Sequence, residues 1–121
     1  DPTVFTNVDS ASEFARQETF GPVVSVSAFS TDEDAFALAN DTPFGLVNYV
    51  HTTNLARAHT AARALQSGTV YVNTFTDLVP TAPYGGFKRS GAGRVGGLEG
   101  LLEFCQVKDI RIGLGAPPLP L

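Results

Sequence analysis

The hydrophobic positions in the first two thirds of the chain follow two spacings, one typical of strands and one typical of helices. The run over residues 23–29 is rich in β-branched residues and predicts a strand, as do residues 46–51 and 69–73. Between them, apolar residues at helical spacing predict one helix from about residue 30 and a second over 55–65. Strands and helices that alternate through short connections are typical of a parallel sheet covered by helices.

Capping and breaking residues predict where these helices begin and end. Ser30 is expected to cap the first helix, whose first turn is acidic, and Pro43 is expected to end it. Thr53 or Asn54 is expected to cap the second helix. Gly68 lies just past its last apolar position, where a left-handed C-cap is expected.

The pattern changes after the third predicted strand. Residues 74–93 form a polar segment rich in glycine and proline, longer than a compact domain usually carries without a functional reason. An apolar helical face over 95–105 and alternating apolar residues over 107–114 predict a last helix and a last strand. Residues 115–121 form a tail with turn-forming residues, and residues 1–17 are mixed, with one helical turn.

Composition and charge exclude several classes of function. The 121 residues carry a formal charge of −4 without a basic block, which argues against a nucleic-acid partner. No apolar run approaches the roughly 20 residues of a membrane span, and no secretory signal opens the chain, so we expect a cytoplasmic protein without a membrane partner. The chain contains no methionine and begins at Asp1, which indicates a piece of a longer protein.

Three sets of residues could indicate a functional site, but in each case the surrounding sequence argues against it. Gly91–Gly96 matches G-x-G-x-x-G, but a polar loop and not a strand precedes it, so a structural turn is favoured. Cys105 is the only cysteine and is predicted on the apolar stripe late in a helix, which favours a packed, inert thiol. His51 and His59 have no third ligand at metal-binding spacing, so no metal site is expected.

Glu18 and Phe20 lie at the mouth of the first predicted strand, near the kind of strand end where α/β sheets collect ligands. A carboxylate there could accept two hydrogen bonds from ribose hydroxyls, and an aromatic ring could pack on a flat ligand ring. From the residues alone, the alternative is a surface acid beside a core phenylalanine.

Four blocks of the sequence resemble the aldehyde dehydrogenase family, in the family's order and spacing. They are Glu18–Val23, Ala39–Leu46, Gly68–Asn73 and Pro83–Gly91. The resemblance covers roughly residues 12–114 and implies an α/β fold, a partial parallel sheet with flanking helices. Residues 1–105 would be the second half of the catalytic domain, 106–114 a C-terminal oligomerisation strand and 115–121 a flexible tail.

The resemblance also implies roles for individual residues. Glu18 matches the acid that binds the nicotinamide-side ribose of NAD or NADP, and Phe20 matches the aromatic beside the nicotinamide. Leu78, within the loop 74–82, and Tyr84 match the region that lines the aldehyde tunnel. The family's nucleophilic cysteine, its water-activating glutamate and most of its cofactor site belong to sequence that precedes these blocks. No catalytic residue is therefore assigned in this chain.

The implied function is that of a fragment of an NAD(P)-dependent aldehyde dehydrogenase, which oxidises an aldehyde to a carboxylic acid through a covalent cysteine adduct. The fragment alone is expected to be inactive. Its expected partners are the aldehyde, the rest of the parent subunit and further copies in a homo-oligomer. Two alternatives stay open: a stand-alone, non-catalytic assembly module that pairs through an exposed sheet edge, and a dinucleotide-binding protein built on Gly91–Gly96.

Overall fold

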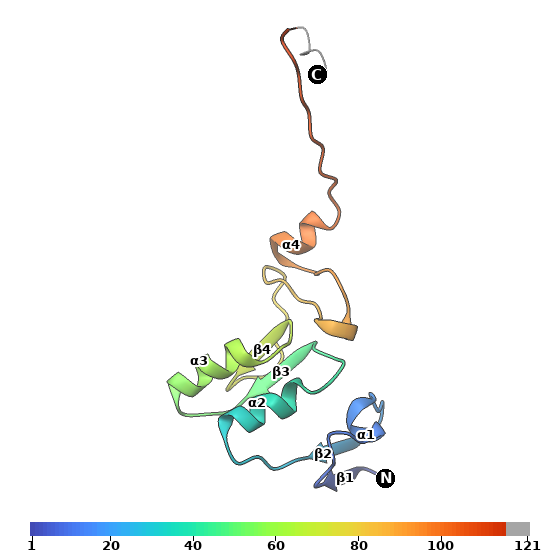
Figure 1. The fold of residues 1–121 in the computed structure, drawn as a ribbon, viewed down its shortest axis with the longest axis vertical. Helices are drawn as coiled ribbons and strands as arrows, with labels where there is room; N and C mark the ends of the chain where they lie inside the picture. The colour runs from blue at the N-terminus through green and yellow to red at the C-terminus, as the bar shows by residue number, and fades with distance from the viewer. Residues whose placement is uncertain (116–121) are drawn as a thin grey trace, which may run out of the picture.

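The computed structural model describes residues 1–115, which contain two separate pairs of parallel strands (Figure 1). Strand β1 (Thr3–Thr6) pairs with β2 (Val23–Val26), and β3 (Val47–Val50) pairs with β4 (Thr69–Val72). The predicted α/β class with parallel pairing is therefore confirmed. The expectation of one sheet through three successive strands is wrong, because β2 takes its hydrogen bonds from β1 and not from β3.

Strand β1 lies in the part of the chain where the pattern predicted only a helical turn. Its four residues, Thr-Val-Phe-Thr, are all exposed and do not alternate between apolar and polar, so the sequence gives no strand signal here. The pairing with β2 is set by register, since Thr3 lies opposite Val23 and Thr6 lies opposite Val26. This segment is a strand because it pairs with β2, and its local propensity alone does not predict it.

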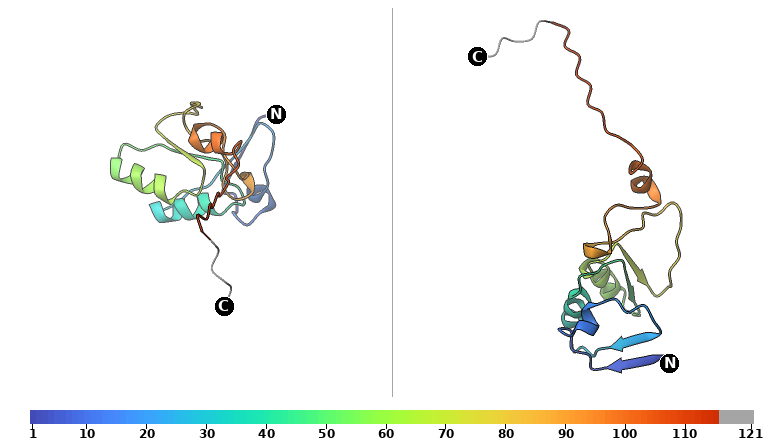
Figure 2. Two further views of the ribbon diagram at one scale, coloured as in Figure 1. Left: turned by 90° about the horizontal axis from the view of Figure 1, so that it is seen from above. Right: turned by 90° about the vertical axis from the view of Figure 1, so that its right-hand side faces the viewer.

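The structure contains four α-helices in its described part, and two of them accompany the β3–β4 pair. They are α1 (Glu13–Arg16), α2 (Asp32–Asn40), α3 (Leu55–Ala64) and α4 (Gly97–Leu102), with a 3₁₀ turn, η1 (Lys88–Ser90). Figures 1 and 2 show α2 and α3 side by side next to this strand pair. An ion pair of 2.7 Å between Arg57 Nε and Asp32 Oδ2 joins the two helices.

The helix caps confirm one sequence expectation and correct another. Asn54 caps α3, since its side chain accepts a hydrogen bond from the backbone N–H of Arg57 at 3.0 Å. The cap of α2 is Thr31 and not Ser30. The Thr31 hydroxyl accepts from the backbone N–H of Asp34 at 3.1 Å, because Thr31 is the last residue with extended backbone before the helix.

The core of the described residues is small and centres on α3. Its buried apolar side chains are Ala58, Ala61 and Leu65, with Ala61 only 1% exposed. Leu55, which was expected on the buried stripe, is exposed at the start of the helix. Many large apolar side chains elsewhere are exposed, and Phe20 and Phe104 are more than 90% exposed. So much exposed apolar area is unusual for a protein of this length standing alone.

Gly68 does not serve as the expected left-handed C-cap. Helix α3 ends at Ala64, and its C-cap, Leu65, has extended backbone geometry with φ −75° and ψ 127°. Gly68 is required for a different reason, because a Cβ built there would overlap the carbonyl oxygen of Gly85. The glycine allows two loops to approach, and does not turn the chain.

The C-terminal part differs most from the sequence expectation. Helix α4 covers only Gly97–Leu102, and the strand expected over 107–114 does not form within the described residues. Figures 1 and 2 show this segment extended and leading away from the rest of the protein. A strand requires a hydrogen-bonded neighbour, and residues 1–115 supply none for this segment. In the same described residues, no helix has the length and apolar character needed to cross a membrane.

Candidate substrate and cofactor site

Three segments meet beside the strand pair β3–β4, and the third of them contains the turn η1. We call residues 40–45, 66–68 and 85–90 together the loop junction. Gly45 lies at its centre. The Gly45 N–H donates to Ser90 Oγ at 2.9 Å, and the Gly45 carbonyl accepts from the N–H groups of Gly68 at 3.1 Å and Phe87 at 2.8 Å. Backbone groups from all three loops therefore satisfy one another at a single residue.

Lys88 ties the junction to the end of α2. Its ammonium group donates to the carbonyl oxygens of Asn40 at 2.7 Å and Thr42 at 3.1 Å, which lie where a helix leaves its last carbonyls unsatisfied. Asn40 in turn donates from Nδ2 to Ala64 O and accepts from the N–H of Gln66. Lys88 holds this position with a left-handed backbone at φ 52°, so its placement has a conformational cost that these bonds offset.

The structure brings the two predicted tunnel residues, Leu78 and Tyr84, into one cavity of about 440 Å³. The remaining residues that line it are Thr69, Tyr71, Asp77, Val79, Pro80, Ala82, Pro83, Val95 and Gly96. Tyr84 is fixed by two backbone hydrogen bonds of 2.8 Å with Val95, which form an isolated antiparallel bridge. The Leu78 side chain, which also lines the cavity, is exposed.

Glu18 and Phe20 lie in the connection between α1 and β2 and are not part of that cavity. The Phe20 ring is 92% exposed, so the alternative of a core phenylalanine is wrong for these residues. Glu18 is also exposed, and none of the three ion pairs within residues 1–115 involves it. Both side chains are therefore free to contact a ligand or another part of a larger protein.

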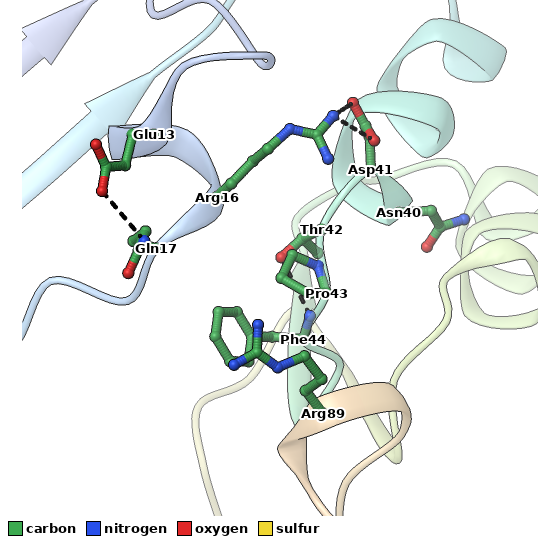
Figure 3. A pocket seen from close by; sticks show the side chains of 9 residues that line it. All are labelled: Glu13, Arg16, Gln17, Asn40, Asp41, Thr42, Pro43, Phe44 and Arg89. Carbon is green, nitrogen blue, oxygen red and sulfur yellow. Dashed lines mark hydrogen bonds and ion pairs between the residues drawn. The ribbon is translucent and has the colours of Figure 1, made fainter.

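A second concave region, of about 660 Å³, lies between α1 and the loop junction (Figure 3). Arg16 reaches from α1 to Asp41, with both carboxylate oxygens 2.9 Å from Nη2, and Arg89 lies over the Phe44 ring at 5.7 Å. Sequence reasoning did not single out these residues, because they come from three distant segments. The ion pair of Arg16 with Asp41 therefore joins α1 to the junction.

The glycine-rich stretch Gly91–Gly96 lacks the strand-turn-helix context of a dinucleotide fingerprint, as the sequence predicted. The 3₁₀ turn η1 precedes it, and a Cβ built on Gly93 would lie 3.1 Å from Glu103 Oε1. A carboxylate therefore stands beside the central glycine, where the fingerprint would place a pyrophosphate. The alternative of an independent dinucleotide-binding protein has no structural support here.

The structure tests the prediction for Cys105. Cys105 is exposed and lies beyond the end of α4, so the prediction of a packed thiol is wrong. The leucine side chains of α4 are themselves exposed, so this helix has no packed apolar face that the thiol could join. The Cys105 thiol donates to the Leu101 carbonyl at 3.6 Å. In the described part of the chain, no cluster of three His, Cys, Asp or Glu side chains could hold a metal ion.

Comparisons with known proteins assign this architecture to a family. A family model described as the aldehyde dehydrogenase family matches residues 1–110. The betaine aldehyde dehydrogenase of Cereibacter sphaeroides is 44% identical over 119 residues, which cover 98% of this chain and 25% of that protein. The NADP/NAD-dependent aldehyde dehydrogenase PuuC of Escherichia coli is 44% identical over 115 residues, which cover 95% of this chain and 23% of that protein. The chain thus spans about a quarter of the length of these curated relatives.

The solved structures that match this chain do so over about a fifth of their own length. The indole-3-acetaldehyde dehydrogenase AldA of P. syringae, in complex with NAD+, has a TM-score of 0.84 and 48% sequence identity, covering 88% of this chain and 22% of that one. The betaine aldehyde dehydrogenase BetB of Staphylococcus aureus, also in complex with NAD+, has a TM-score of 0.83 and 43% identity, covering 86% of this chain and 21% of that one. Such agreement indicates a shared fold over the matched part.

Proposed function

The chain belongs to the aldehyde dehydrogenase family, and on this premise we propose that residues 1–105 form the second half of the catalytic domain of an NAD(P)-dependent aldehyde dehydrogenase. The whole enzyme would oxidise an aldehyde to a carboxylic acid. The observation that carries the proposal is a family match over residues 1–110, in a chain that spans only about a quarter of its relatives. The exposed apolar side chains fit this proposal, because the remainder of a catalytic domain would cover them.

In this proposal, Glu18 and Phe20 contribute the nicotinamide end of the cofactor site. The exposed Glu18 carboxylate would accept hydrogen bonds from two ribose hydroxyls, and the exposed Phe20 ring would pack beside the nicotinamide. NAD or NADP would take up the hydride that leaves the aldehyde carbon. The role of these two side chains is to orient the nicotinamide, while most of the cofactor contacts come from outside this chain.

The cavity lined by Leu78 and Tyr84 is proposed as one wall of the aldehyde tunnel. Its volume of about 440 Å³ falls within the usual range of small-molecule sites. Tyrosine, leucine, valine and proline side chains dominate its lining, which suits an aldehyde with an apolar or aromatic body. The class of aldehyde would follow from how these side chains shape the entrance.

Residues 106–114 are proposed to pair as a strand with another subunit. Ile110, Ile112 and Leu114 alternate along this segment and are all at least 71% exposed. The backbone of the segment makes no hydrogen bond within residues 1–115, so it can add to a sheet edge of a second copy. This arrangement would make the protein a homo-oligomer.

The proposal is tested by Glu18→Gln in the full-length protein that carries these residues. We expect the KM for NAD+ or NADP+ to rise about tenfold, because the neutral amide loses charge-assisted hydrogen bonds to ribose. Glu13→Gln is the matched control, since Glu13 is an exposed acid whose carboxylate accepts from Gln17, the C-cap of α1. Steady-state kinetics at saturating aldehyde would measure both variants.

An unchanged cofactor KM in Glu18→Gln, or an equal rise in Glu13→Gln, would contradict the cofactor role of Glu18. The isolated chain is expected to form no NADH from aldehyde and NAD+, because no residue in it is assigned as nucleophile. Robust aldehyde-dependent NADH formation by the pure chain would overturn that part of the proposal.

A further inference from the structure

The segment 74–82, which carries Leu78, is anchored firmly at both of its ends. At its start, the Asn73 side chain accepts from the N–H of Thr52 at 2.9 Å and donates to the Thr52 carbonyl at 2.8 Å. Near its end, the N–H of Gly97 donates to the Pro80 carbonyl at 2.9 Å. Between these anchors the side chains are exposed, so the middle of the segment depends on other contacts for its position.

Two tyrosines on neighbouring strands supply those contacts. Tyr49 of β3 and Tyr71 of β4 lie directly opposite each other in the parallel register, and their rings stack at 5.5 Å with an interplanar angle of 19°. Both hydroxyl groups reach the segment. Tyr71 donates to the Asp77 carbonyl at 3.1 Å, and the Tyr49 hydroxyl is hydrogen-bonded to the hydroxyl of Thr76.

These two bonds hold consecutive residues, Thr76 and Asp77, immediately before Leu78. Tyr71, Asp77 and Leu78 all line the cavity of about 440 Å³, so the tether acts on the cavity wall itself. A stacked pair of rings loses little conformational freedom when its hydroxyls bond, because each ring is already held by its neighbour. The pair is therefore suited to fix the wall at a defined distance from Tyr84.

We propose that Tyr49 and Tyr71 are positioning residues, which set the shape of the aldehyde tunnel by tethering the 74–82 segment through their hydroxyl groups. This inference rests on the proposed function, since it assigns the cavity to the aldehyde. Neither tyrosine touches the reacting atoms in this account. With the tether, the wall contacts and so favours small aldehydes. Without it, the tunnel admits bulkier aldehydes but binds aldehydes more weakly.

The experiment compares Tyr49→Phe, Thr76→Val and the double variant in the full-length protein. Phenylalanine keeps the stacked ring and removes only the hydroxyl. For a short aliphatic aldehyde such as propanal, we expect KM to rise about fivefold in each single variant with kcat unchanged. The double variant is expected to resemble either single one, because both remove the same bond. Tyr71→Phe is expected to raise KM by a similar factor.

Hydrogen exchange of the 74–82 segment gives a second readout that does not depend on activity. The Ala82 amide, which donates to the Val79 carbonyl at 3.0 Å within this segment, is expected to exchange about fivefold faster in Tyr49→Phe and Tyr71→Phe. Thr60→Val is the matched control, since the Thr60 hydroxyl makes a similar exposed bond, to the Ala56 carbonyl within α3. We expect this control to leave both KM and segment exchange unchanged.

The outcomes separate the tether from the proposed function. If the wild-type protein oxidises no aldehyde, the proposed function fails, and faster exchange confined to 74–82 still supports the tether. Segment exchange that is unchanged in both tyrosine variants overturns the tether, whatever the activity. Additive effects of Tyr49→Phe and Thr76→Val on KM, or a fall in kcat without a change in KM, also overturn it, because each would show that the tyrosine acts by another route.

Discussion

The loop junction and the C-terminal segment 106–114 both belong to stretches that the sequence marked as informative, yet only the junction completes its structure within this chain. The junction joins three loops through backbone hydrogen bonds to Gly45 and through the Lys88 ammonium group. The C-terminal segment has a clear alternating pattern and remains extended without a hydrogen-bonded neighbour among residues 1–115.

The difference teaches where each pattern finds its partner. The glycines of the junction allow close backbone approach between three loops of this chain, so the hydrogen bonds of the junction are made within the chain itself. An alternating strand pattern specifies a face and a register, but its hydrogen bonds must come from another strand. The junction therefore completes its hydrogen bonds within residues 1–115, whereas the pairing of the C-terminal segment with a second subunit stays a proposal.

The largest expected effect comes from filling the junction. Gly68→Ala places a Cβ against the Gly85 carbonyl oxygen, which is backbone and cannot move aside cheaply. We expect the free energy of unfolding to fall by about 3 kcal/mol, as in severe overpacking. Urea unfolding of the full-length protein measures it. Gly113→Ala is the control, since its nearest neighbour would lie 3.9 Å away, and a similar loss in both variants would contradict the role of the junction.

An intermediate effect is expected on assembly from the C-terminal segment. Ile112→Pro removes a backbone N–H that a strand ladder would use, so the dissociation constant of the oligomer should rise about tenfold or more. Analytical ultracentrifugation over a range of concentrations measures this constant, and Ile112→Val is the control that keeps the N–H. Identical sedimentation of both variants and the wild type would show that the segment does not pair between subunits.

The smallest effect tests the lysine of the junction. Lys88→Met removes two hydrogen bonds to the end of α2, and we expect a loss of about 1 kcal/mol because the ammonium group is exposed. Lys108→Met, in the C-terminal segment, removes an equal charge without such bonds. Thermal unfolding of the two variants side by side measures the difference. Equal shifts would mean that net charge, and not the bonds of Lys88, accounts for the change.

Much of the fold around the site was predictable from the sequence. The parallel strands β2, β3 and β4, the cap at Asn54 and the end of α2 before Pro43 all follow from local patterns that tertiary contacts reinforce. Leu78 and Tyr84 line one cavity, and their role in an aldehyde tunnel stays a prediction. The cofactor role of Glu18 and Phe20 stays a prediction, since the structure shows their exposure and no ligand contact.

Contacts between segments that are distant in the sequence could not be predicted from single residues. The stacked pair Tyr49 and Tyr71 was missed because it depends on the register between two strands, although both tyrosines occupy the third position of their strands. The ion pair of Arg16 with Asp41 joins residues 25 positions apart, and nothing local marks it. Strand β1 was missed for the same reason, since β2 alone decides that it forms.

The sequence by itself determined the secondary-structure class, the helix boundaries near strong caps and the blocks that carry the family resemblance, because these depend on local periodicity and on residue types with special backbone geometry. Only the tertiary structure decided which strands pair, why Gly68 must be glycine and which hydroxyl groups hold the cavity wall. These last features depend on distances between segments far apart in the chain, and such distances are set by packing and not by local propensity.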